Sequence, residues 1–144
     1  MTTREAATQA VLNLLVATNA FVTTGRRNRD PETIPAKETP ALFVLNRSES
    51  IRRPSPSLPP IRTLHMQIVV YVDDGGDETV IPSQTIHGLL ETIDAAFAPD
   101  DPTSQRCTLG GAVFSAIIEG ETIEAPGDMS GRGLAIVPLD VILP

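Results

Sequence analysis

The chain has few of the residue types that usually mark a function. Its 144 residues include one cysteine, two histidines and no tryptophan, and aromatic residues make up only 3%. A single cysteine excludes a disulfide within the chain, which fits a reducing compartment. Because aromatic side chains are so scarce, the core must be built from leucine, isoleucine, valine and alanine.

Long apolar runs are missing as well. No stretch approaches the roughly 20 apolar residues that a membrane-spanning helix needs. The first residues also lack the features of a secretory signal, which are a basic region, then an apolar run, then a cleavage site. We therefore expect no membrane insertion and no signal peptide. A length of 144 residues predicts a single domain over residues 1–144.

Catalytic and metal-binding motifs are absent from the sequence. There is no Ser/His/Asp set with a nucleophile elbow, no phosphate-binding glycine loop and no paired-cysteine zinc site. His65 falls on the polar side of a predicted strand, and the other histidine is His87. Neither has a cysteine or carboxylate at ligand spacing, so we interpret His65 as a sheet residue. We expect no catalytic residue, no metal and no cofactor.

The apolar periodicity predicts an α+β fold. Spacing of three and four residues predicts helices over residues 4–21 and 82–98. Apolar runs and alternation predict four strands, over residues 41–45, 61–72, 109–120 and 134–143. Pro138 in the last strand indicates an edge position or a bulge. We expect a mainly antiparallel sheet of about four strands, with both helices packed on one face.

Residues 46–60 are rich in proline and arginine. Because proline cannot donate a hydrogen bond to a sheet, this segment is predicted to be an extended arm and not a central strand. A loop of this length in a compact domain is usually functional or disordered. We favour contact with a neighbouring subunit or partner over disorder. The contacting residues are predicted to be Arg47, Arg52, Arg53 and Arg62.

Charge is unevenly distributed along the chain. The net charge of −7 argues against a protein that grips nucleic acid through its phosphates. Residues 1–72 hold nine Lys/Arg and five Asp/Glu, a balance of +4, whereas residues 73–144 hold two and thirteen, a balance of −11. Two such halves could pair head to tail between copies of the chain or neutralise each other within one monomer. The sequence leaves both arrangements open.

The order of segments resembles a known family. A leading helix is followed by Pro-Ala-Leu-Phe-Val-Leu at 40–45, the Arg- and Pro-rich segment, and an alternating strand that ends in Val-Val-Tyr-Val at 69–72. An amphipathic helix, a Leu-Gly-Gly-Ala-Val turn at 109–113 and a final β segment complete the order. Over residues 5–142 this resembles the tail terminator (tail completion) family of long-tailed bacteriophages.

The resemblance implies a structural protein and not an enzyme. Members of that family form a hexameric ring on the end of the tail tube, which stops tube growth and presents a surface for head joining. The implied partners are further copies of the chain, the major tail tube protein and a neck or head-completion protein. The implied location is the tail-neck region of the virion, after assembly in the host cytoplasm. DNA would pass through the ring without specific binding.

One acidic loop has a place in this scheme. Glu121, Glu124 and Asp128 lie on the longest connection of the second half of the chain. Carboxylates repel phosphates, so they would suit a channel through which DNA slides. We therefore expect these residues to line the channel or its rim. A head–tail neck or head-closure ring is the main alternative function, and a small enzyme is a less favoured one.

Overall fold

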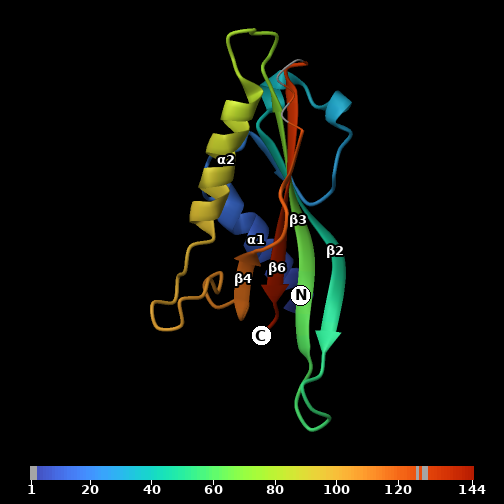
Figure 1. Ribbon diagram of the computed structural model, residues 1–144, viewed down its shortest axis with the longest axis vertical. Helices are drawn as coiled ribbons and strands as arrows, with labels where there is room; N and C mark the ends of the chain where they lie inside the picture. Colours follow the sequence, from blue (N-terminus) through green and yellow to red (C-terminus); the bar gives the residue numbers. More distant parts are fainter. Residues whose placement is uncertain (1–2, 126, 128–129) are drawn as a thin grey trace.

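The computed structural model describes residues 3–125, 127 and 130–144. It is an α+β fold in which two helices cover one face of a six-stranded sheet (Figure 1). In chain order the elements are α1 (Thr3–Val16), β1 (Thr23–Gly25), the short 3-10 helices η1 (Pro31–Thr33) and η2 (Ala36–Glu38), β2 (Ala41–Arg52), β3 (Ile61–Asp73), α2 (Pro82–Ala96), β4 (Ser115–Ile118), β5 (Ile123–Ala125) and β6 (Arg132–Ile142).

The predicted sheet was wrong in strand number and strand direction. The order is β1-β2-β3-β6-β4, with β5 also paired to β6, and the sheet is mixed because β1 runs parallel to β2. Both β1 and β5 are only three residues long. Strands this short carry too little alternation to be recognised in a sequence, and they are held by pairing with longer neighbours. The prediction of an α+β class with two helices agrees with the structure.

The long β2–β3 hairpin corrects the prediction for residues 46–60. Pairing runs from Ala41 opposite Tyr71 to Arg52 opposite Ile61, so β2 continues through much of the predicted arm. The prolines do not interrupt it, because all four lie in the tip that follows, at 53–60. A shift of register between Asn46 and Ser48 marks a β-bulge at Arg47. In Figure 1 the hairpin extends well beyond the rest of the sheet.

Alternation along β3 gives one face to the main core, as the sequence predicted, and the other face carries a second apolar layer that the sequence did not predict. One set of side chains faces the helices and joins the main core with α1 and α2; it comprises Leu64, Met66, Ile68, Val70 and Val72. Val69 and Tyr71 point to the other face. There they pack with Phe43 and with Ile34 from the segment that covers this end of the sheet. The main core is largely aliphatic, as the scarcity of aromatic residues requires, whereas the second layer contains Phe43 and Tyr71, whose ring centroids are 5.9 Å apart.

The helices end close to their predicted limits, with one difference. The apolar stripe of the first helix continues in sequence to residue 21, but α1 stops at Val16. Thr18 donates its hydroxyl to the Leu15 carbonyl at 2.6 Å, and Asn19 adopts a positive φ of 57°. A left-handed residue cannot continue a right-handed helix, so the chain leaves the axis there.

The predicted strand over 109–120 is shortened to β4. Three successive residues, Leu109, Gly110 and Gly111, have positive φ angles and turn the chain. The Asp100 carboxylate accepts the Thr108 and Gly110 N–H groups at 2.7 and 2.9 Å, which fixes this turn. These hydrogen bonds lower the pKa of Asp100, with the Gly110 N–H as the largest cause.

Pro138 lies in β6 at a position with local edge character. β5 pairs with Leu134 to Ile136, and β4 pairs with Leu139 to Ile142. Between them, Val137 and Pro138 have a described strand partner only on the β3 side. A residue without an N–H is tolerated best where one side of the strand has no neighbour.

Replacing the fully buried Ile68 tests the central strand. Ile68 is 0% exposed, so Ile68→Ala should lower the free energy of unfolding by about 2–5 kcal/mol through lost burial and a residual cavity. Ile123→Ala, at a position 55% exposed, should change it by less than about 0.5 kcal/mol. Chemical denaturation of both variants measures the difference. Equal effects would contradict the burial of β3 in the core.

Candidate functional site

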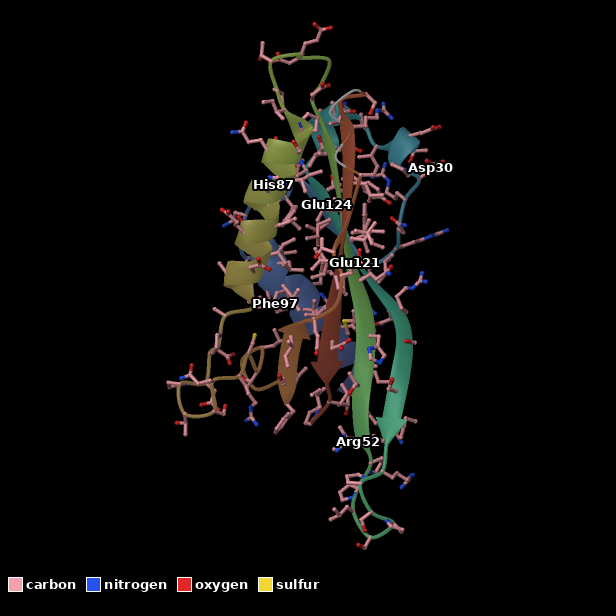
Figure 2. The ribbon with its side chains drawn as sticks, in the orientation of Figure 1. Asp30, Arg52, His87, Phe97, Glu121 and Glu124 are labelled. Atoms are coloured by element: carbon pink, nitrogen blue, oxygen red, sulfur yellow. The ribbon has the colours of Figure 1, made fainter. Side chains whose placement is uncertain are left out.

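The exposed arginines lie along the hairpin and its tip. Arg47 and Arg52 are on β2, Arg53 opens the tip, and all three are exposed. Within the described part of the chain, none of them makes an ion pair. Figure 2 shows Arg52 near the far end of the hairpin. Three uncompensated positive charges on a projecting element suit contact with an acidic partner, and that contact stays a prediction.

Arg62 differs from the other three arginines because it has a partner within the chain. Glu49 receives two hydrogen bonds from Arg4, at 2.6 and 3.1 Å, and one from Arg62 at 3.3 Å. Arg4 belongs to α1, so this carboxylate ties the first helix to both strands of the hairpin. The hydrogen bond from Arg4 is the main cause of a lowered pKa for Glu49.

A hydrogen-bonded chain crosses three strands on the face opposite the helices. The Ser50 hydroxyl lies 2.6 Å from Nε2 of His65, and His65 Nδ1 lies 2.7 Å from an Asp140 carboxylate oxygen. The three residues come from β2, β3 and β6. The sequence did not reveal this set because the set depends on strand register. The available signal was that His65 and Asp140 each occupy a polar position between two apolar residues, whereas Ser50, between Glu49 and Ile51, has no such pattern.

This set has the order of a catalytic triad, but the main pockets of the described residues lie elsewhere. A nucleophile, a base and an orienting carboxylate are in hydrogen-bond reach. Acyl transfer also needs a substrate pocket and donors for the oxyanion. None of the main pockets in the described part of the chain is lined by Ser50, His65 or Asp140. We therefore interpret the set as a structural link, in which hydrogen bonds between side chains hold the three strands together.

The acidic residues predicted for a channel lie at the opposite side of the sheet from β2. Glu121 precedes β5 and Glu124 is part of it, and both are exposed (Figure 2). Asp128 lies outside the described residues. Glu121 and Glu124 make no ion pair with any other described residue. Their role in a channel or rim stays a prediction.

The described residues include neither a cluster of side chains placed to hold a metal ion nor a helix able to span a membrane. No group of three or more His, Cys, Asp and Glu side chains among these residues is placed to hold a metal ion. None of the described helices is both long and apolar enough to cross a membrane. Cys107 is buried, and burial raises the pKa of its thiol.

Comparison with known proteins gives a similarity of fold. No family model matches the sequence, and no curated protein is similar to it. The fold is similar to a chain of a solved structure described as the virion of a native gene transfer agent (GTA) particle. That similarity has a TM-score of 0.51 and 11% identity, and it covers 94% of this chain and 92% of the other. The two chains therefore share a fold over nearly their whole length.

The ion pairs of Glu49 with Arg4 and Arg62 are predicted to make a pH-dependent contribution to the free energy of unfolding. Since the pKa of Glu49 is lowered in the folded state, its stabilising effect is complete above the ordinary glutamate value near 4.5 and is lost as the pH falls through the folded value. Glu49→Gln should lower the melting temperature at pH 7, and the gap from the wild type should narrow in acid. Glu91→Gln, on the exposed side of α2, is the matched control. A gap that stays constant with pH would contradict the ion-pair account.

The interpretation of Ser50 as a structural residue is tested with a fluorophosphonate, which reacts with activated serines. We expect no covalent adduct on Ser50 by mass spectrometry, because none of the main pockets among the described residues is lined by Ser50. Labelling of Ser50 that disappears in both His65→Gln and Asp140→Asn would overturn this interpretation. It would make the enzyme alternative the better one.

Proposed function

We propose that this chain is a structural protein of a phage-like particle and, more specifically, that it forms a ring that caps the tail tube. The observation that carries the proposal is the similarity of fold, over nearly the whole chain, to a chain of a gene transfer agent virion. The order of sequence segments supports the specific role of tail terminator. Copies of the chain, most simply six, form the ring.

The shape of the chain fits a capping role. A tail tube grows by adding identical rings, each of which exposes edges that template the next. A terminator must match the end of the tube on one side and offer no template on the other. The projecting β2–β3 hairpin supplies a contact element, and its tip holds four prolines, which disfavour further strand addition.

The hairpin arginines provide a second part of the proposal. Arg52 and Arg53 contact an acidic surface on a tail tube subunit or a neighbouring copy. A single exposed ion pair contributes only about 0–1 kcal/mol, so several must act together. The net charge of −7 is consistent with a ring through which DNA passes without binding specifically.

A neck or head-closure ring is the alternative within the same class of particle. Both kinds of protein form rings, so ring formation alone does not separate them. The difference lies in what limits tube length, because only a terminator blocks the growing end.

Loss of the gene should therefore change tail length. We expect deletion to give tubes that run beyond normal length, and complementation with the intact gene to restore uniform tails. Negative-stain electron microscopy of particles from both strains measures the length distribution. Uniform tails of normal length that fail to attach to heads would reject the terminator role and favour the neck protein.

A further inference from the structure

Unpaired basic side chains lie at one lateral edge of the sheet, and unpaired acidic side chains lie at the other. At one edge, called here the basic edge, lie β1 with Arg27 shortly after it and the bulge of β2 with Arg47. At the other, the acidic edge, lie β5 and the residues before it, with Glu119, Glu121 and Glu124. The carboxylates and both arginines are exposed. Within the described chain none of these five residues has an ion-pair partner.

The strand register places matching parts of the two edges at the same level of the sheet. Successive cross-strand partners lead from one edge to the other; they are Gly25, Phe43, Val69, Ile136 and Ile123. β1 and β5 are therefore level. Arg27 is two residues after the end of β1, and Glu121 is two residues before the start of β5. Because the two strands run in opposite directions, these charges lie beyond the same end of the level pair.

A second pair of charges lies in the same part of the sheet. Arg47 lies in the bulge beside the pairs of β2 with Met66 and His65. Those residues pair with β6 at 139–140, which in turn pairs with β4 at 117–118. Glu119 directly follows β4, so it lies one to two residues along the sheet from the level of Arg47. Both edges therefore carry these charges in the same part of the sheet, positive on one and negative on the other.

Strand direction also fits. β1 is parallel to β2, β2 and β6 are each antiparallel to β3, and β5 is antiparallel to β6. It follows that β1 and β5 run in opposite directions. Two copies related by rotation about an axis along the strands point the same way, so β1 of one copy and β5 of the next would be antiparallel. That is the pairing that forms most readily between exposed edges.

We propose that the basic edge of one copy binds the acidic edge of the next, with β1 beside β5 and with Arg27 and Arg47 of one copy near Glu119 and Glu121 of the other. This inference rests on the proposed ring and names its subunit interface. In the described chain, β1 pairs only with β2 and β5 only with β6, so each has a free side. Exposed apolar side chains are present at both strands: Val22, directly before β1, is 63% exposed, and Ile123, the first residue of β5, is 55% exposed.

The occupant is a second copy in a head-to-tail contact. A twofold contact of one edge with itself would place like charges together, whereas the head-to-tail contact satisfies both edges of every copy. This assignment gives Glu121 an interfacial role in place of the channel role that its sequence position predicted.

Reciprocal charge reversal tests the interface. One variant carries Arg27→Glu and Arg47→Glu, and the other carries Glu119→Lys and Glu121→Lys. Each alone should need at least about tenfold more protein to assemble than the wild type, because opposed like charges destabilise the contact. An equimolar mixture should recover assembly, since copies that alternate around a ring meet opposite charge at every interface.

The control variant places the same change of charge on α2. Glu91→Lys with Asp94→Lys alters exposed residues of that helix and should leave assembly unchanged. All variants should keep the melting temperature of the wild type, because the described structure gives the substituted side chains no ion pair. Mass photometry across a concentration series reads the assembly state.

Disulfide trapping gives an independent readout of the same contact. Thr24 and Glu124 are level through the strand register, so the double variant Thr24→Cys, Glu124→Cys should form covalent ladders under oxidation. Thr24→Cys with Glu91→Cys is the matched control and should form none. Buried Cys107 should not take part.

The outcomes separate the inference from the proposed function. Wild-type rings with no rescue in the charge mixture and no ladder would overturn the interface and leave the ring proposal standing. A wild-type chain that stays monomeric, both alone and on tail tubes, would overturn both.

Discussion

The pairing of β3 with strands on both of its sides determines the rest of the molecule. β3 spans Ile61–Asp73 and pairs with β2 and with β6 along nearly its whole length. Because its side chains alternate, one face receives both helices and the other receives the segment around Ile34. The same pairing carries β2 and the start of β3 outward as a hairpin, beyond the region that the helices cover. The exposure of Arg47, Arg52 and Arg53 is a consequence of that extension.

Polar contacts then fix the hairpin where no apolar layer covers it. Glu49 links it to α1 through Arg4, and Ser50 and His65 link it to Asp140 of β6. These contacts lie on opposite faces of the sheet. A projecting hairpin held on both faces can present its arginines in a defined direction. That property is required of an element that must match a repeating surface.

Features that follow from the periodicity of apolar residues could be predicted from the sequence, whereas features that depend on the pairing register of the strands could not. The two faces of β3 and the apolar stripe of α2 follow from alternation and from spacings of three and four, and both are present. The extension of β2 was missed because the prolines at 53–60 were taken to affect the residues before them. β1, β5 and the Ser50–His65–Asp140 set depend on which residues lie opposite each other in the folded sheet. No local pattern in the chain states that.

The short edge strands connect the fold to assembly. Exposed strand edges favour association, and proteins usually protect them with short strands and with charge. Here both devices are present, but the unpaired charges named on the two edges are opposite in sign. An arrangement that prevents an edge from pairing with its own kind also favours pairing with the other edge. In the proposed ring, these opposite charges would meet at each contact between copies.

Electron microscopy of the purified protein, alone at high concentration and added to tail tubes, tests the central claim most directly. The account predicts closed rings in which all hairpins point the same way and β1 of each copy lies beside β5 of the next. Monomers or twofold dimers under both conditions would contradict it.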